Sequence, residues 1–155
     1  MGFWDKLRDQ VQATERCEEA SCSDRPEIAD GKLKPPDRAE IGRAAWRYVH
    51  SRAVDYPEQP SPQEIEREQN WIASFIQTYP CQHCAHEFVE ICAQIPPDLS
   101  GRDNYVMWWC KAHNGVRDDL SQDVDVKCNL KDLLAAGRAG IPMGEWYKQC
   151  QAKPN

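Results

Sequence analysis

The sequence predicts an all-α fold, a four-helix bundle with a short fifth helix. Apolar residues recur at spacings of three and four in four successive segments, which is typical of helices that bury one face. Capping residues precede these segments, and no segment shows the alternation of apolar and polar residues that a half-buried strand requires. The short connections between the segments favour an up-and-down arrangement.

The first helix of the bundle has a clear start signal. Asp37 is followed three residues later by Glu40, which is a capping-box pattern, and apolar residues then repeat along one face. This pattern predicts a helix that runs to about Val54. The prolines at positions 57, 60 and 62 predict a loop after it.

The next two helices are bounded by prolines. Ser61 can cap the second helix and Pro62 can occupy its first position, while Pro80 ends it. A third helix is expected to begin at Pro80–Cys81 and to end before Pro96.

Two more helices follow. Ser100 is a possible cap for a fourth helix, whose apolar residues lie within 105–120. The short fifth helix is expected at Asn129–Ala136, with Gly137 as the left-handed residue that stops it.

The chain divides by composition into three parts. We expect residues 1–36 to form a flexible N-terminal arm, residues 37–140 to form the helical domain, and residues 141–155 to form a C-terminal tail. The arm opens with apolar residues at helical spacing, so the alternative is a docked terminal helix, which would be marginal unless it packs on something. The opening ten residues also lack the apolar core that a secretory leader needs.

Charge and hydrophobicity exclude two classes of function. The chain has 19 Lys and Arg against 25 Asp and Glu, a formal net charge of −6, which disfavours binding to a nucleic acid backbone. No stretch approaches the roughly 18 consecutive apolar residues of a membrane span. We therefore expect neither nucleic acid nor a membrane as a partner.

Cysteine is the unusual residue type in this composition, with eight in 155 residues. An even number suits disulfides, but a chain of this size can also bury a core without them, so thiol chemistry and metal ligation stay open. The eight residues are Cys17, Cys22, Cys81, Cys84, Cys92, Cys110, Cys128 and Cys150.

The most informative cysteines are Cys81 and Cys84, which are separated by two residues at the expected start of a helix. The free amides and dipole of a helix N-terminus stabilise a thiolate, so this pair suits redox chemistry. One alternative is a zinc site with Cys110 and His113 as the other two ligands, and another is a local disulfide staple.

Cys110 and Cys128 enclose 17 residues, and a disulfide between them would tie the fifth helix to the fourth. In the chain-entropy account, a loop of this size is worth about 3 kcal/mol. The alternative is two unrelated buried thiols. We interpret Cys92 as a buried free thiol.

Two helices each present an aromatic residue beside an imidazole. Trp46 and His50 are four residues apart, and so are Trp109 and His113, so each pair shares one helix face. Taken singly, a histidine of this kind is more often an ordinary core or surface residue than one that contacts a ligand. Two such faces that converge near Cys81 and Cys84 would form a slot for a flat, hydrogen-bonding ring system.

Together these motifs resemble the Erv/ALR family of FAD-linked sulfhydryl oxidases, over about residues 40–128. The resemblance rests on four segments in order: Gly42-Arg43-x-x-Trp46-x-x-x-His50, Tyr56-Pro57, Tyr79-Pro80-Cys81-x-x-Cys84-Ala85 and Trp109-Cys110-x-x-His113-Asn114-x-Val116. It implies the family's FAD-binding helical bundle, in a homodimer, and a flavin-linked oxidase that forms disulfides in protein substrates.

The resemblance also implies roles for individual residues. Cys81 would exchange with substrate, Cys84 would lie against the flavin, and Cys110 and Cys128 would form a structural disulfide. No metal ligand is expected. The implied cofactor-binding residues are Gly42, Arg43, Trp46, His50, Tyr56, Cys84, Glu87, His113, Asn114, Val116 and Arg117.

The implied partners are reduced protein thiols or a dithiol relay oxidoreductase as donor, and oxygen or cytochrome c as acceptor. Cys17 and Cys22 on the arm are candidates for a shuttle pair, although one of them could instead bridge Cys150 of a neighbouring subunit. We expect the mitochondrial intermembrane space, because no secretory leader is seen, with the endoplasmic reticulum or a virus, where the family also occurs, as alternatives.

Overall fold

The computed structural model describes residues 1–14, 36–120 and 126–141. These residues form six helices and no strand, which confirms the all-α prediction. None of the six helices is both long and apolar enough to cross a membrane. The helices are α1 (Phe3–Gln12), α2 (Arg38–Val54), α3 (Pro62–Thr78), α4 (Gln82–Gln94), α5 (Arg102–Asp119) and α6 (Leu130–Ala139).

The helix starts follow the predicted capping patterns. At α2 the Asp37 side chain accepts a hydrogen bond from the Glu40 N–H (2.8 Å), and the Glu40 carboxylate accepts one from the Asp37 N–H (2.9 Å). Ser61 and Glu64 form the same reciprocal pair at the start of α3, with Pro62 in the first turn. Local sequence therefore determines where these two helices begin.

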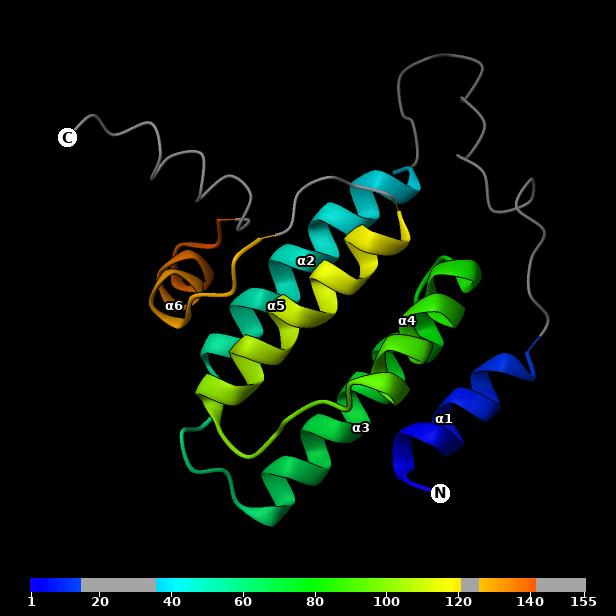
Figure 1. Ribbon diagram of the computed structural model, residues 1–155, viewed down its shortest axis with the longest axis horizontal. Helices are drawn as coiled ribbons and strands as arrows, with labels where there is room; N and C mark the ends of the chain where they lie inside the picture. Colours follow the sequence, from blue (N-terminus) through cyan, green and yellow to red (C-terminus); the bar gives the residue numbers. More distant parts are fainter. Residues whose placement is uncertain (15–35, 121–125, 142–155) are drawn as a thin grey trace.

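Helices α2, α3, α4 and α5 form the bundle (Figure 1). Helix α5 packs on α2 and on α4, and α3 packs on α4. Helix α6 packs across α2 and α5, while α1 lies on the other side of the bundle, alongside α4 (Figure 1).

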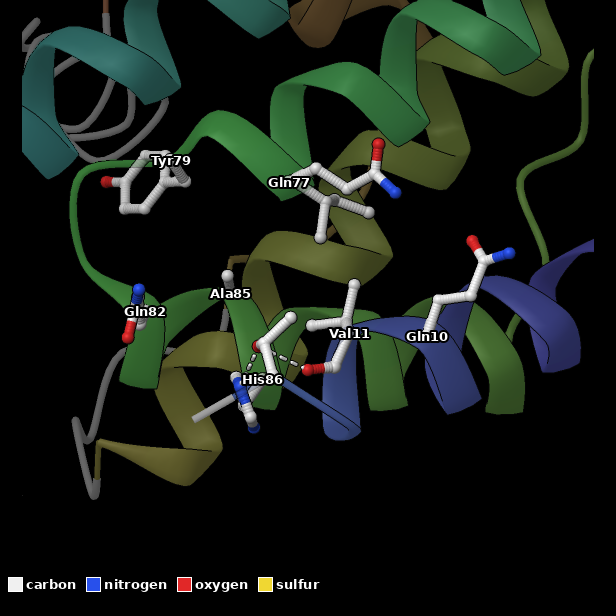
Figure 2. A pocket seen from close by; sticks show the side chains of 9 residues that line it. Gln10, Val11, Gln77, Tyr79, Gln82, Ala85 and His86 are labelled. Carbon is white, nitrogen blue, oxygen red and sulfur yellow. Dashed lines mark hydrogen bonds between the residues drawn. The ribbon is translucent and has the colours of Figure 1, made fainter. Parts of the chain in front are cut away.

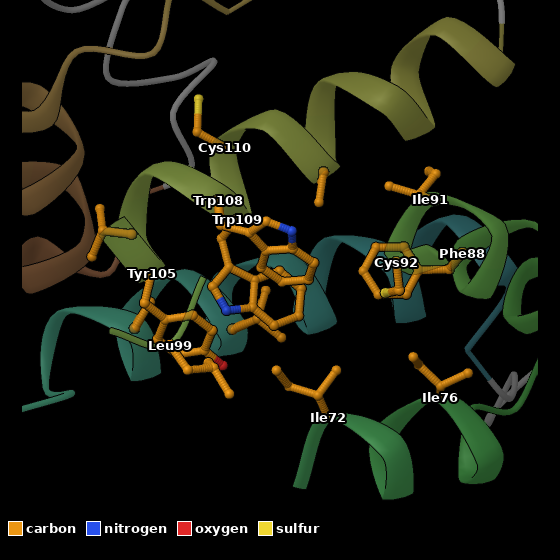
Figure 3. Close-up of a cluster of buried hydrophobic side chains, with 14 of the residues drawn as sticks. Ile72, Ile76, Phe88, Ile91, Cys92, Leu99, Tyr105, Trp108, Trp109 and Cys110 are labelled. Carbon is orange, nitrogen blue, oxygen red and sulfur yellow. The ribbon is translucent and has the colours of Figure 1, made fainter. Parts of the chain in front are cut away.

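The core is rich in aromatic rings (Figure 3). Trp109 and Tyr105 of α5 are fully buried, and so are Ile72 and Ile76 of α3. The ring of Phe88 from α4 stacks on Trp109 with centroids 5.9 Å apart. Burial of such large side chains is the main contribution to the stability of this bundle.

An ion pair between a half-buried arginine and a buried glutamate ties three helices together. The Arg52 guanidinium on α2 donates two hydrogen bonds to the Glu68 carboxylate on α3, at 2.9 and 2.7 Å, and the Tyr105 hydroxyl on α5 donates a third at 2.8 Å. Arg52 also lies over the ring of Trp71, 4.1 Å from its centroid. Glu68 is only 5% exposed, so its charge depends on these partners.

The start of α5 differs by one residue from the expected cap. Gly101 occupies the N-cap position, because the Ser100 hydroxyl donates a hydrogen bond to Asp98 instead (2.5 Å). The chain approaches Glu58 so closely here that a Cβ at Gly101 would lie 2.8 Å from the Glu58 carbonyl oxygen.

The end of α6 also differs from the expectation. The helix continues through Gly137 to Ala139 and stops at Gly140, which has the left-handed φ of 64°. Gly137 serves another purpose, since a Cβ there would lie 2.6 Å from Cγ1 of Val54 and 3.0 Å from the carbonyl oxygen of His50. Its missing side chain lets α6 lie against α2.

The beginning of the chain differs from a free arm. Residues 3–12 form α1, whose Leu7 and Val11 belong to the buried core, because their spacing of four places both on the face that meets α4. Residues 15–35 of the expected arm, including Cys17 and Cys22, lie outside the described residues, and so does the tail from residue 142 with Cys150.

Candidate active site

Cys81 and Cys84 form a disulfide at the start of α4, with their Cα atoms 5.2 Å apart. Tyr79 adopts an extended conformation and ends α3, and Cys81 is the N-cap of α4. The Cys84 N–H donates a hydrogen bond to the Cys81 sulfur at 3.2 Å. This amide and the helix dipole stabilise negative charge on sulfur, so the pair is poised for thiol–disulfide exchange.

The two sulfurs lie in different surroundings. Cys81 is 6% exposed, while Cys84 is half-buried and therefore the more accessible of the two. The sequence-based assignment had Cys81 as the thiol that meets substrate. Exposure alone does not support that role, because Cys81 is the more buried of the two.

The aromatic and imidazole pairs of α2 and α5 do converge. Trp46 and His113 stack with ring centroids 3.7 Å apart and planes 4° from parallel. His50 Nε2 lies 3.0 Å from His113 Nδ1, so one of the two nitrogens donates and the other accepts. Trp109, by contrast, lies in the core, although its ring contacts that of Trp46 at 6.3 Å.

Both histidines are neutral at physiological pH. Burial lowers the pKa of His50 to about 4 and that of His113 to about 2, and the positive charge of Arg117 adds to both shifts. The site thus offers uncharged imidazoles, which can donate and accept hydrogen bonds, next to a permanent cation.

Asn114 organises the segment that returns to α5. Its side-chain amide donates to the Val126 carbonyl (2.8 Å), and its oxygen accepts from the Val126 N–H (3.2 Å) and from Arg117 Nη1 (2.8 Å). The Cys110–Cys128 disulfide fastens the same segment, with Cα atoms 5.9 Å apart. Asn114 therefore positions both the segment and the Arg117 guanidinium.

All three cysteines of the zinc alternative are disulfide-bonded: Cys81 pairs with Cys84, and Cys110 pairs with Cys128. Across residues 1–14, 36–120 and 126–141, no group of three or more His, Cys, Asp or Glu side chains is arranged to hold a metal ion. Cys92 is fully buried with a free thiol, and burial raises its pKa.

The remaining candidate residues divide into two groups. Gly42 on α2, Glu87 on α4 and Val116 on α5 are half-buried, and Arg43 is exposed. Tyr56 belongs to the core instead: its ring packs against Tyr105 at 4.9 Å and its hydroxyl donates to the Leu99 carbonyl at 3.0 Å. The structure thus groups Tyr56 with the loop that packs on α5, not with the Trp46–His113 stack.

Phe88 is a site residue that the sequence did not single out. It follows Cys84 by one helical turn, and its ring contacts Trp46 at 6.2 Å, so the helix that begins at the disulfide also meets the Trp46–His113 stack. The spacing of four from Cys84 was the available signal. A second unexpected residue is His86, which is buried against α1.

Comparisons with known proteins agree with this geometry. The family model of the Erv1/Alr family matches residues 43–134. The FAD-linked sulfhydryl oxidase ERV2 of Saccharomyces cerevisiae is 34% identical over 99 residues, which are 64% of this chain and 48% of that protein. The mitochondrial FAD-linked sulfhydryl oxidase ERV1 of the same yeast is 35% identical over 89 residues, 57% of this chain and 47% of that protein. The chain thus spans about half the length of the relatives it matches.

Solved structures show the same fold. The crystal structure of the yeast Erv1 core matches with a TM-score of 0.60 and 27% identity, over 80% of this chain and 92% of that one. The FAD-binding domain of Saccharomyces cerevisiae Erv1 matches with a TM-score of 0.61 and 28% identity, over 70% of this chain and 100% of that one. With a helical bundle, a disulfide at the start of α4 and a family match over most of the helical domain, the chain belongs to the Erv1/Alr family.

Proposed function

We propose that this protein is an FAD-dependent sulfhydryl oxidase that forms disulfides in protein substrates. One observation carries this proposal: the Cys81–Cys84 disulfide lies one helical turn from Phe88, whose ring contacts the Trp46–His113 stack. A dithiol redox centre is thereby linked to a flat surface of aromatic and imidazole rings. The FAD-linked relatives support the same activity.

The residues around Trp46 fit a flavin dinucleotide. Such a molecule has a planar ring system and a diphosphate anion, and the half-buried rings of Trp46 and His113 are flat groups of the kind that pack against such a ring system. His50 and His113 offer neutral hydrogen-bonding groups, and Arg117 offers a cation. The residues that would hold the cofactor are the cofactor-binding residues implied by the family resemblance, together with Phe88, which contacts Trp46. Tyr56 would act from the core, where it packs on Tyr105.

In the proposed reaction, a donor thiolate attacks the Cys81 sulfur. A mixed disulfide forms between the donor and Cys81, and Cys84 leaves as a thiolate next to the N-terminal amides of α4. The donor's second thiolate then attacks the donor sulfur that is bonded to Cys81 in the mixed disulfide, and Cys81 leaves as a thiolate. The donor loses two electrons and becomes a disulfide, and Cys81 and Cys84 become a dithiol. Bound FAD would accept that electron pair and pass it to an external acceptor.

The wider assignments belong to the same proposal. We propose reduced protein thiols or a dithiol relay oxidoreductase as donor, oxygen or cytochrome c as acceptor, and a homodimer as the functional unit. Cys17 and Cys22 would relay electrons from the donor to Cys81. We propose a mitochondrial location because two of the relatives are named mitochondrial. The alternatives are a virus, since one relative is viral, and the endoplasmic reticulum, since ERV2 is not named mitochondrial.

The decisive measurement is the visible absorption spectrum of the purified protein, before and after anaerobic addition of a small dithiol. We expect a yellow protein that bleaches with the dithiol and regains its colour in air. Cys84→Ser should keep the colour but not bleach, while Cys92→Ser, eight residues farther along α4, should behave as the parent does. A protein that stays colourless after incubation with FAD, or a Cys84→Ser variant with the parent's turnover, would overturn the proposal.

A further inference from the structure

Helix α1 is attached to α4 through apolar side chains and through a buried histidine. Leu7 and Val11 of α1 belong to the core. His86 of α4, two residues after Cys84, is 3% exposed and lies beside Val11 at the end of α1 (Figure 2). A buried imidazole needs a partner for each of its two ring nitrogens, so the contacts of His86 define its protonation state.

The Nδ1 atom of His86 donates a hydrogen bond to Gln12. It lies 3.0 Å from the side-chain oxygen of Gln12. The orientation of this amide is fixed by its nitrogen, which donates to the His86 carbonyl at 3.1 Å and to the Glu90 carboxylate at 3.3 Å. Because the amide oxygen can only accept, Nδ1 carries a proton.

The Nε2 atom of His86 also faces an acceptor. It lies 3.0 Å from the hydroxyl oxygen of Thr14. That hydroxyl donates its one proton to the Val11 carbonyl at 2.6 Å, since a carbonyl oxygen can only accept. A lone pair of the hydroxyl therefore faces Nε2, and Nε2 carries a proton as well. An imidazole with protons on both nitrogens is an imidazolium cation.

The groups around His86 suit a cation. Glu90 follows His86 by four residues on α4, on the same helix face, and the Gln12 amide joins its carboxylate to the histidine. Burial raises the pKa of Tyr79 at the end of α3, so this hydroxyl stays neutral over the pH range in which a histidine titrates. The other side chains that α1 and α3 present around His86 are uncharged: Gln10, Val11, Gln12, Thr14, Ile76 and Gln77.

The two histidines of the aromatic site show the opposite arrangement. A hydrogen bond joins His50 to His113, and the positive charge of Arg117 adds to the effect of burial in lowering the pKa of both. His86 instead has two oxygen acceptors and a carboxylate nearby. Burial by itself favours the neutral ring, so the charge on His86 depends on the α1 residues that accept its protons.

From these contacts we infer that His86 is an imidazolium that fastens α1 to α4, and that this attachment weakens as the pH rises. The neutral ring has one proton on its nitrogens, so it can donate to Gln12 or to Thr14 but not to both. The sign follows from linkage, because the attached helix binds a proton that a locally opened α1 holds less tightly. The contact is thus a pH-sensitive device on the helix that carries Cys84.

The protonation state is measured on the full chain with ¹⁵N-labelled histidine. Long-range ¹H–¹⁵N NMR spectra show whether each ring nitrogen carries a proton. At pH 6.5 an ordinary histidine is about half protonated, and we expect His86 to carry both protons. A neutral His86 at this pH in the parent protein would overturn the inference, and this result needs no variant.

Two substitutions at Thr14 separate the hydroxyl from the shape of the side chain. Thr14→Val keeps the shape but removes the oxygen that accepts from Nε2, so His86 should be mostly neutral at pH 6.5 in this variant. Thr14→Ser keeps the hydroxyl and is the matched control, which should behave as the parent does. Full protonation of His86 in Thr14→Val would mean that the hydroxyl does not hold the second proton.

Hydrogen exchange of the amides in the last turn of α1 measures the strength of the attachment. Protection factors, which correct for the intrinsic effect of pH on exchange, should fall about fivefold or more from pH 6 to pH 8 in the parent and change less than about twofold in Thr14→Val. His50 and His113 act in the other direction, since acid weakens the bundle. Parent protection that is constant or rises with pH would overturn the inference, and neither measurement depends on the proposed oxidase activity.

Discussion

The indole of Trp46 and the imidazole of His113 stack in parallel, 3.7 Å apart, and bring the middle of α2 against the middle of α5. The contact depends on both helices, since neither residue has a stacking partner this close within its own helix. Phe88 of α4 touches the same indole, so three helices meet at Trp46. The stack is therefore the natural place to test how the proposed cofactor is held.

Replacement of Trp46 by alanine should weaken FAD binding. An aromatic stack contributes about 0.5–1.5 kcal/mol beyond the area it buries, so we expect the Kd to rise by about tenfold. Trp46→Phe should retain most of the affinity because it keeps a flat ring. Titration of the FAD-free protein with FAD, followed by fluorescence, measures both constants. An unchanged Kd in Trp46→Ala would place the cofactor elsewhere.

Stability should fall with acid because of His50 and His113. Their pKa values in the folded protein, about 4 and about 2, lie below the ordinary value of 6.5, so the unfolded chain binds more protons below pH 6.5. The effect is absent well above pH 6.5, and stability is lost as the pH falls from 6.5 to about 4 for His50 and to about 2 for His113, with a slope of up to about 1.4 kcal/mol per pH unit for each histidine.

Urea unfolding between pH 7 and pH 4.5 measures this dependence. His113→Gln, which cannot take up a proton, should make the slope shallower, although it also lowers stability at pH 7. Parent and variant curves that run parallel over this range would show that His113 does not cause the loss.

Gly137→Ala should destabilise the protein although alanine is the better helix former. The new Cβ would lie 2.6 Å from Cγ1 of Val54 and 3.0 Å from the backbone oxygen of His50, so α6 must shift from α2. We expect a loss of about 1–3 kcal/mol, as in other overpacked sites. Gly42→Ala is the control, because its Cβ would meet only the Tyr79 hydroxyl at 3.9 Å, and it should stabilise α2 by up to about 1 kcal/mol. Chemical denaturation of both variants decides whether close packing or helix propensity dominates at Gly137.

The Arg52–Glu68 pair should be costly to break and cheaper to replace. Arg52→Met leaves the buried Glu68 carboxylate with the Tyr105 hydroxyl alone, and we expect a loss of about 3 kcal/mol. The double variant Arg52→Met with Glu68→Leu should recover part of this loss, because no buried charge then remains. A double-mutant cycle of unfolding free energies measures the coupling, and additive losses would mean that the pair does not act as a unit.

Helix starts could be read from the sequence because the signals are local. Asp37 with Glu40 and Ser61 with Glu64 lie within one turn of each other, and the structure shows both capping boxes. Gly137 was misread for the same reason. A glycine near the end of an apolar run looks like a stop signal, and only the neighbouring α2 shows that it is a contact point.

Long-range relationships were beyond local patterns. The spacing within each helix indicated that Trp46 and His50 share a face, as do Trp109 and His113, but not that His113 would stack on Trp46 while Trp109 is buried in the core. No local pattern distinguishes Glu68 from an exposed glutamate on an amphipathic helix. Its burial depends on Arg52 and Tyr105, which are 16 and 37 residues away along the chain.

Periodicity and capping act over three to seven residues, so local sequence patterns predict the helical fold, the starts of α2 and α3, and the cysteine pair at the start of a helix. What each side chain faces depends on how the helices pack in three dimensions. This packing turned Phe88 towards the Trp46–His113 stack, turned Ala85 and His86 towards α1, and made the first helix part of the core. Those outcomes arise from the packing of whole helices, in which the burial of apolar faces selects the neighbours and the polar side chains then find their partners.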